Sequence, residues 1–173
     1  MKKLWKKVVV CVSALTILLS FTAQASVTVS DNEPEEIVLL SEDVRRSKDV
    51  VDGERGSIVG GVSSEIINES GGNIGFIIQT LCYVECDKIS NTAILERYDE
   101  SRDKWTEVAR YQFNAKKADF PSGLSALTNS MTVKNQRKGY YYRIRGIHHV
   151  EAEGQILNYS SLTDGLLITE FGR

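Results

Sequence analysis

The chain has 173 residues, 42% of them hydrophobic and 25% charged, and its formal net charge is −2. A chain of this length can bury a hydrophobic core and suits a single domain. The near-neutral charge gives no electrostatic basis for binding nucleic acid, and it disfavours anionic membrane surfaces. We therefore expect no nucleic-acid partner.

The first 25 residues have the composition of a secretory signal peptide. Four lysines lie within residues 2–7, an apolar stretch covers residues 8–21, and small residues stand at Ala23 and Ala25. As a helix the apolar stretch would span about 21 Å, short of the roughly 30 Å hydrocarbon core of a bilayer. The sequence predicts cleavage between Ala25 and Ser26 and a secreted, extracellular product without a membrane span.

Cleavage would remove four positive charges and take the net charge from −2 to −6. The excess of acids lies in residues 26–56, a stretch with few apolar residues that ends in the sequence DGERG. Pro34 could begin a helix, with acidic residues in its first turn. We predict residues 26–56 to be an acidic leader, partly disordered or helical, and residues 57–173 to be the folded domain.

From residue 57 onward, short runs of β-branched and aromatic residues alternate with turn residues, which indicates β-strands. About seven strands without a long helical pattern predict an all-β fold, a single antiparallel β-sandwich of the fibronectin or immunoglobulin type. Asn91 interrupts the apolar face of one strand, so we expect it either at a solvated edge or hydrogen-bonded inside. The predicted strands cover residues 63–69, 74–81, 88–98, 105–113, 125–133, 140–150 and 156–169.

Removal of the signal peptide leaves two cysteines, Cys82 and Cys86. An exported protein can keep a disulfide. In one extended strand their Cα atoms would be about 13 Å apart, beyond the roughly 7 Å limit for a bridge. A disulfide therefore requires that residues 82–86 bend into a loop, and the alternative is two free thiols, one or both buried as small hydrophobic side chains.

Two segments near the C-terminus resemble those of a known family: residues 138–146 (KGYYYRIRG) and residues 161–165 (SLTDG). They are similar to the G-Y-Y-Y-R-[IV]-[RK] strand and the S-x-T-D-G segment of small secreted proteins of Gram-positive bacteria, a family of uncharacterised function. The resemblance covers about residues 55–168 and departs at Asn91, where a hydrophobic residue is usual. It implies secretion but supplies no activity, so no catalytic residue is carried over from it.

The tyrosine-rich strand also resembles strand F of fibronectin type III domains. Side chains alternate along a strand, so Tyr140, Tyr142, Ile144 and Gly146 should face the core, and one of the tyrosines could form a tyrosine corner. The opposite row should face solvent. Tyrosine and arginine are enriched in recognition sites, which makes this row a candidate binding surface. The alternative is that its arginines only solvate the sheet. The row consists of Tyr141, Arg143, Arg145 and His149.

The sequence favours a binding protein over an enzyme. His148 and His149 are the only histidines, and neighbours in a strand point to opposite faces, so the pair cannot chelate one metal. The chain has no HExxH, GxSxG or glycine-rich phosphate motif. Trp105 is expected as a core residue or cross-strand partner.

We therefore predict a secreted protein, without catalysis, metal or cofactor, that binds an extracellular protein or glycan. One alternative is a structural subunit of an extracellular assembly that pairs through sheet edges. The other alternative is a hydrolase whose catalytic residues are dispersed along the chain.

Overall fold

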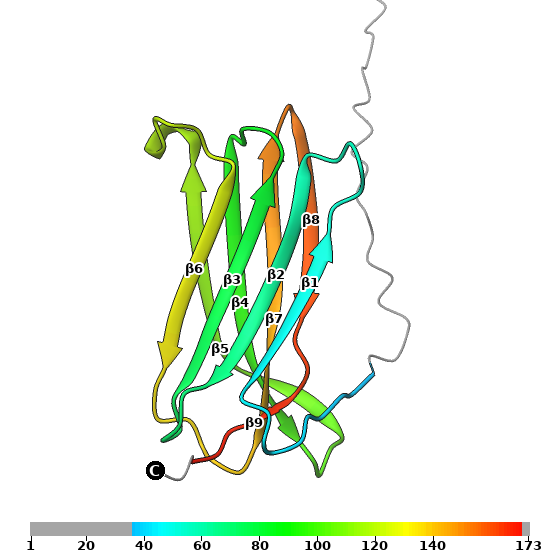
Figure 1. Cartoon of the computed structure of the whole chain (residues 1–173), viewed down its shortest axis with the longest axis vertical. Coiled ribbons are helices and arrows are strands. Elements are labelled where there is room, and N and C mark those ends of the chain that lie inside the picture. Colours follow the sequence, from blue (N-terminus) through cyan, green and yellow to red (C-terminus); the bar gives the residue numbers. More distant parts are fainter. Residues whose placement is uncertain (1–35, 171–173) are drawn as a thin grey trace, which may run out of the picture.

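The computed structural model describes residues 36–170 (Figure 1). In this range the chain forms nine β-strands, one 3₁₀ turn (η1, Lys117–Asp119) and no α-helix. The prediction of an all-β fold is therefore confirmed. The strands are β1 (Arg46–Asp52), β2 (Val59–Asn68), β3 (Ile74–Cys82), β4 (Lys88–Asp99), β5 (Lys104–Lys116), β6 (Ala126–Val133), β7 (Tyr141–Ala152), β8 (Gln155–Leu162) and β9 (Leu166–Leu167).

Two antiparallel sheets pack against each other, which confirms the predicted β-sandwich. The first sheet has the order β1-β2-β3-β6, and the second has the order β5-β4-β7-β8, with the short β9 also paired to β7. Figure 1 shows the first sheet in front of the second. In the second sheet β7 lies between β4 and β8, the position that strand F has between C and G in immunoglobulin-like sheets.

Strand β1 moves the start of the folded domain to before residue 57. The sequence predicts residues 26–56 as a leader, but β1 pairs along its whole length with β2, from Arg46 opposite Ile67 to Asp52 opposite Gly61. The pattern conceals this strand because alternate residues are exposed and mostly charged. Before β1, residue 39 forms a parallel bridge with residue 165, so this part of the leader also contacts the sandwich.

The predicted signal peptide and its cleavage site between Ala25 and Ser26 lie outside the described residues, as does the part of the leader up to residue 35. Within residues 36–170, no helix is long and apolar enough to cross a membrane.

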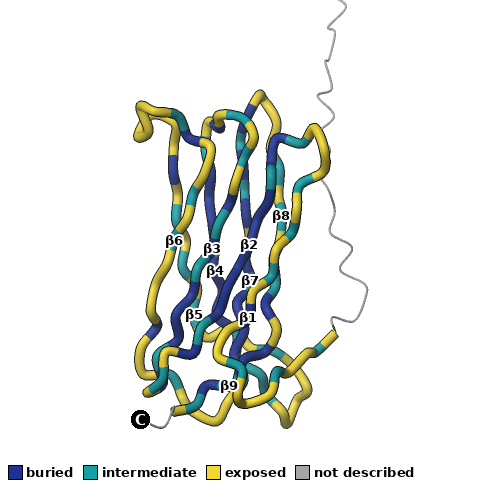
Figure 2. Tube along the Cα trace, viewed as in Figure 1, coloured by how far each residue is buried: buried dark blue, intermediate teal, exposed yellow. Residues whose placement is uncertain are grey.

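Buried residues run along the inner faces of both sheets, where they form two hydrophobic clusters (Figure 2). A band of polar side chains lies between the clusters. On β2, for example, Val62 belongs to one cluster and Ile66 to the other, and the buried residue between them on the same face is Ser64. We call this band the polar belt, and its members are Ser64, Thr80, Asn91, His148 and Ser161.

Candidate binding surfaces

Strand β7 presents one buried row and one partly exposed row, as the alternation of its side chains predicts. In the inner row Tyr142, Ile144 and His148 are fully buried. Tyr140 precedes the strand and is 43% exposed, so its predicted place in the core is wrong. The buried hydroxyl of Tyr142 has no hydrogen-bond partner among residues 36–170, so this residue forms no tyrosine corner.

The row predicted to bind a partner is not one exposed surface. Tyr141, Arg145 and His149 are half-buried, but Arg143 is only 3% exposed. The expectation that Arg143 faces solvent is therefore wrong. His149 lies six positions along the strand from Arg143, about 20 Å in extended backbone, so these four residues do not form a compact site.

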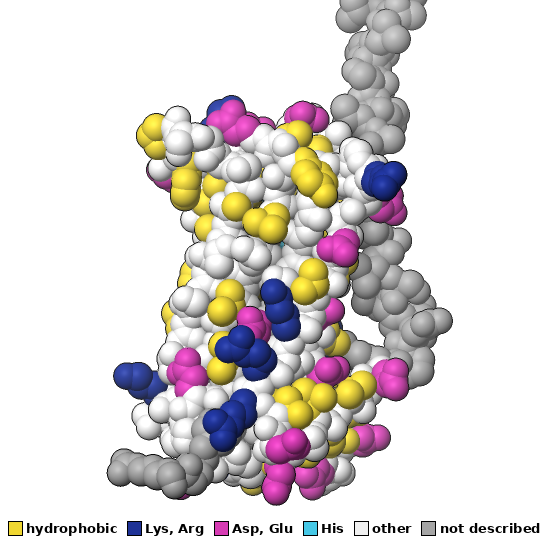
Figure 3. Space-filling model, viewed as in Figure 1, with side chains coloured by type: hydrophobic (Ala, Val, Ile, Leu, Met, Phe, Trp, Pro, Cys, Tyr) yellow, Lys and Arg dark blue, Asp and Glu magenta, His cyan; other side chains and the backbone are white. Residues whose placement is uncertain are grey.

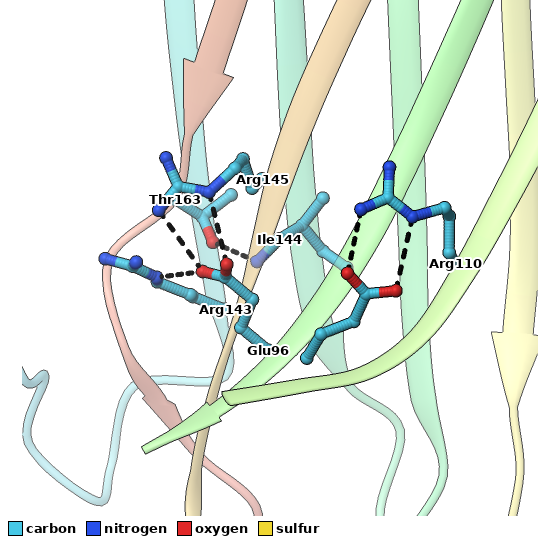
Figure 4. Close-up of polar contacts among 7 residues, drawn as sticks. Glu96, Arg110, Arg143, Ile144, Arg145 and Thr163 are labelled. Atoms are coloured by element: carbon cyan, nitrogen blue, oxygen red, sulfur yellow. Dashed lines mark hydrogen bonds and ion pairs between the residues drawn. The ribbon is translucent and has the colours of Figure 1, made fainter. Parts of the chain in front are cut away.

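Glu96 on β4 accounts for the burial of Arg143. The two residues are directly opposite each other in the pairing of β4 with β7. Arg143 Nε donates to Glu96 Oε2 at 2.7 Å, and Arg145 Nε donates to Glu96 Oε1 at 3.2 Å. Figure 4 shows both guanidinium groups turned toward this one carboxylate. Sequence reasoning missed Glu96 because nothing local to either strand specifies which residues lie opposite each other.

Trp105 on β5 also covers Arg143. The guanidinium carbon of Arg143 is 4.3 Å from the centroid of the indole ring, in cation–π geometry. Trp105 packs as well against Tyr98, directly opposite on β4, with 5.3 Å between ring centroids. Trp105 is therefore a cross-strand partner, one of the two roles that the sequence predicts for it. A Cβ atom on Gly165 would lie 2.9 Å from the indole, so the segment after β8 is also close to this ring. Arg143 is thus a structural residue of the sheet.

His149 belongs to a separate polar group near the opposite end of β7. Its Nδ1 is 2.9 Å from Asn158 Oδ1, and its Nε2 is 3.0 Å from Glu151 Oε1. Lys88 donates to the same Glu151 oxygen at 2.8 Å. The hydrogen bond from Lys88, followed by that from His149, lowers the pKa of Glu151. Within residues 36–170 no cluster of three or more His, Cys, Asp or Glu side chains is arranged to hold a metal ion.

His148 lies in the polar belt between the sheets. Its Nδ1 is 2.9 Å from Thr80 Oγ1, and its Nε2 is 2.8 Å from Ser161 Oγ. The contacts continue from Ser161 to Ser64 at 2.7 Å, and from Thr80 to Asn91 at 2.6 Å. Asn91 is therefore hydrogen-bonded inside, which decides between the two predicted positions for this residue.

The belt determines which ring nitrogen of His148 carries the proton. Thr80 donates its only hydroxyl hydrogen to Asn91, so the Nδ1–H of His148 donates to Thr80. Nε2 is then the acceptor for the hydroxyl of Ser161. Burial lowers the pKa of His148 to about 4, so the ring is neutral at pH 7. The geometry does not support a hydrolase pair, because His148 is fully buried and its Nδ1 faces a threonine instead of a carboxylate.

Cys82 and Cys86 flank the turn that follows β3. Both are free thiols in the structure, with Cys82 half-buried and Cys86 fully buried. Burial, followed by the hydrogen bond with the Cys86 thiol, raises the pKa of Cys82 to about 12. The turn supplies the bend that a disulfide requires, and the oxidised form stays a prediction.

The two sides of the sandwich differ in how their sheet edges are covered. On one side, side chains of β1 bond to backbone at and just beyond the end of β8. Asp49 Oδ2 accepts the N–H of Leu162 at 2.7 Å, and Ser47 Oγ accepts the N–H of Asp164 at 3.0 Å. These contacts satisfy backbone donors that an open edge would leave free.

On the other side, β6 ends the first sheet, and within residues 36–170 it pairs only with β3. Cys82 N–H donates to Ser125 O at the start of this pairing. Hydrogen-bonded pairs alternate along an antiparallel ladder, so the backbone groups of every second residue of β6 point to the open edge. We call these four the edge residues of β6, and they are Ala126, Thr128, Ser130 and Thr132.

The space-filling view shows the outer face of the first sheet (Figure 3). Over β2 and β3, hydrophobic side chains gather in the upper half of this face, and Lys and Arg side chains lie in the lower half. Leu81 and Tyr83, at the end of β3, are 44% and 71% exposed. The border formed by β6 is uncharged along the strand, because its sequence is ALTNSMTV.

No family model matches the chain, and a search of curated proteins finds no match. These comparisons therefore assign neither a family nor an activity. The resemblance to small secreted proteins of Gram-positive bacteria stays a prediction.

Proposed function

We propose that this chain is a secreted, non-catalytic β-sandwich that binds an extracellular polypeptide at the open edge of β6. The partner adds a strand to the first sheet and bonds to the outward backbone groups of the edge residues. Strand addition of this kind gives affinity through main-chain hydrogen bonds and specificity through alternate side chains.

The contrast between β6 and the other edges supports this proposal. Edge strands are usually protected from pairing by charges, bulges, proline or a covering segment. On the β1–β8 side, β1 carries charged residues along its edge, and its Asp49 accepts the N–H of Leu162 at the end of β8. Strand β5 has an irregular register at Val108 and carries charged residues along its length. Strand β6 has eight residues without charge, proline or glycine, and its register with β3 is regular.

A proline in β6 tests the proposal. The Ser130 N–H points to the open edge, so Ser130→Pro removes one outward donor without removing a bond to β3. The matched control is Gln112→Pro on β5, at a position whose N–H also points away from the sheet. The mature protein, immobilised, is used to capture polypeptides from extracellular fractions, and each variant's thermal midpoint is recorded.

We expect Ser130→Pro to capture at least tenfold less polypeptide than the wild type and Gln112→Pro to capture as much as the wild type. Both variants should stay folded. If Ser130→Pro captures as much as the wild type, β6 is not the site. If both prolines reduce capture equally, the effect is not specific to the β6 edge, and the proposal also fails.

A second candidate function is glycan binding beside the start of β7. Tyr140 is 43% exposed, with the guanidinium of Arg97 over its ring at 5.3 Å, and Tyr141 and Arg145 follow it as half-buried residues. Exposed aromatic rings with adjacent arginines suit the faces and hydroxyl groups of sugars. Arg143 is excluded from this site because its side chain is buried against Glu96.

This candidate predicts a different mutational pattern. Tyr141→Ala combined with Arg145→Ala should abolish binding on a glycan array and leave the thermal midpoint nearly unchanged, while Ser130→Pro should bind glycans as the wild type does. A large fall in the midpoint of the double variant would instead make these two residues structural.

A further inference from the structure

We infer that the polypeptide bound at β6 is a second copy of this chain, paired antiparallel about a two-fold axis to join the first sheets of two copies into one. This inference rests on the proposed function, because it names the occupant of the same edge. It places the chain among subunits of extracellular assemblies.

One register uses every outward backbone group of both strands. Ala126 lies opposite Thr132 of the second copy, Thr128 lies opposite Ser130 of the second copy, and the two-fold axis passes beside Asn129. Any other antiparallel register that keeps hydrogen-bonding residues opposite each other leaves at least one of the four edge residues unpaired. The side-chain pairs are compatible as well, since Thr–Ser pairs across strands are favourable and no charges meet.

Antiparallel pairing of two copies through β5 instead of β6 would be unfavourable. Lys117 N–H donates to Asp87 O, so the outward backbone groups of β5 belong to Arg110, Gln112, Asn114 and Lys116. In the equivalent register Arg110 would lie opposite Lys116 of the second copy, at both ends of the interface. Like charges directly opposite each other destabilise strand pairing. Self-pairing is therefore specific to β6 among the two edges on this side.

The residues beyond the ends of β6 are complementary in charge. The chain that follows the strand is basic, with Lys134, Arg137 and Lys138, all exposed. In the register above, Lys134, one residue beyond the strand, would approach the segment of the second copy that leads into β6 and contains Leu124. Next to Leu124 is a shallow depression that contains one carboxylate, and it is lined by Glu85, Pro121, Ser122, Gly123 and Ser125.

Glu85 lies where the lysine of the second copy would arrive. A Cβ atom on Gly123 would be 3.5 Å from Glu85 Oε1, so the carboxylate flanks the backbone opposite Lys134. Glu85 already pairs with Lys117 at 2.8 Å, and both side chains are about half exposed, so the carboxylate is accessible to a second cation. Antiparallel pairing brings Lys134 of each copy toward Glu85 of the other at both ends of the interface. Parallel pairing would instead place the two lysines together at one end and the two glutamates together at the other.

Oligomeric state gives the first test. Sedimentation of the mature protein at several concentrations should show a monomer–dimer equilibrium. Ser130→Pro should weaken dimerisation at least tenfold, and Gln112→Pro should leave it unchanged. A wild type that stays monomeric at every concentration overturns the inference, as does a dimer that Ser130→Pro does not affect.

A pair of cysteines tests the register. Residues 128 and 130 face each other across the two copies at a Cα separation of about 5.5 Å, within the range of a disulfide. The variant with Thr128→Cys and Ser130→Cys should therefore form a covalent dimer under mild oxidation. The control carries Gln112→Cys and Asn114→Cys on β5 and should not, and the wild type controls for Cys82 and Cys86. Equal cross-linking of both variants contradicts the register.

Charge reversal tests the contact at the ends. Lys134→Glu and Glu85→Lys should each weaken self-association about tenfold, because attraction becomes repulsion at two symmetric places. An equimolar mixture of the two variants should regain association. If the mixture stays as weak as the single variants, Lys134 does not lie beside Glu85.

The results separate this inference from the proposed function. If the wild type is monomeric but Ser130→Pro no longer captures a different extracellular protein, the edge binds polypeptide, and the inference that its partner is a second copy of this chain is wrong. If Ser130→Pro changes neither dimerisation nor capture, both proposals fail.

Discussion

The two rows of β7 bury polar side chains in opposite ways. In the inner row, His148 is fully buried and kept neutral, with hydroxyl groups of Thr80 and Ser161 on its two ring nitrogens. In the outer row, Arg143 is only 3% exposed and stays charged, with the carboxylate of Glu96 opposite it. Each row therefore contains one polar residue whose burial depends on partners from other strands.

The difference has a physical origin in the two environments. Between the sheets no water replaces a lost partner, so an ion is costly there and a neutral hydrogen-bonded network is the stable solution. On the outer face Arg143 is held by a carboxylate, an indole ring and neighbouring strands, and Glu96 is still 13% exposed. Position in a row sets the direction of a side chain, and the neighbouring strands set its burial.

The largest expected effect is at Glu96. Glu96→Ala leaves the buried guanidinium of Arg143 without its carboxylate, and breaking a buried ion pair from one side costs about 4 kcal/mol of unfolding free energy. Denaturant unfolding measures this loss.

The control for that experiment is Glu107→Ala. Glu107 pairs with Arg110 at 2.8 Å on the same outer face, but both side chains are about half exposed. The midpoint of denaturant unfolding should therefore barely change in this variant. Equal midpoints for the two variants would show that the outer row is only a solvated face, as the sequence allows.

A smaller effect is expected from Gly146→Ala in the inner row. A Cβ atom at this position would collide with the hydroxyl oxygens of Ser64 and Ser161 and lie 2.8 Å from His148 Nε2. Overpacking a tight core and displacing three hydrogen-bonded groups should cost about 3 kcal/mol. Ser160→Ala, on the exposed side of β8, is the control and should change unfolding by less than about 0.5 kcal/mol. A Gly146→Ala variant as stable as the control would mean that the belt can be rearranged at little cost.

Local patterns were sufficient to predict most of the fold. Alternation and turn residues predict the strands from β2 to β7 to within about four residues, because each carries β-branched or aromatic runs. The last predicted strand, residues 156–169, is in the structure divided into β8 and the short β9. Strand β1 escapes this pattern, since its exposed residues are mostly charged and its stability comes from pairing with β2. A polar edge strand looks like a leader until its partner is known.

The candidate site was harder to predict than the fold. The sequence identifies Tyr141, Arg143 and Arg145 as one row but gives no sign of Glu96 or of the stacking of Trp105 on Arg143. Both contacts join residues more than 30 positions apart in the sequence, and they depend on strand order and register. The same holds for the open edge, which exists only because β6 ends a sheet.

The smallest of the three effects is a pH dependence that comes from the inner row alone. The pKa of His148 is about 4 in the folded protein and near its ordinary value of 6.5 when unfolded. Above pH 6.5 both states are neutral at this ring and the full stability is present. As the pH falls from about 6.5 to about 4, the unfolded state takes up the proton first, so stability is lost. The linkage gives a loss of about 2 kcal/mol between pH 7 and pH 5.

Comparing variants isolates this contribution from that of the carboxylates. His148→Gln should remove about 2 kcal/mol of the decrease between pH 7 and pH 5, measured by denaturant unfolding at each pH. His149→Gln is the matched control from the outer row and should retain the full decrease, because its ring is partly exposed and already bonded to Glu151. If both variants keep the same slope as the wild type, His148 is not held neutral by burial. The contrast between a neutral inner row and a charged outer row would then be wrong.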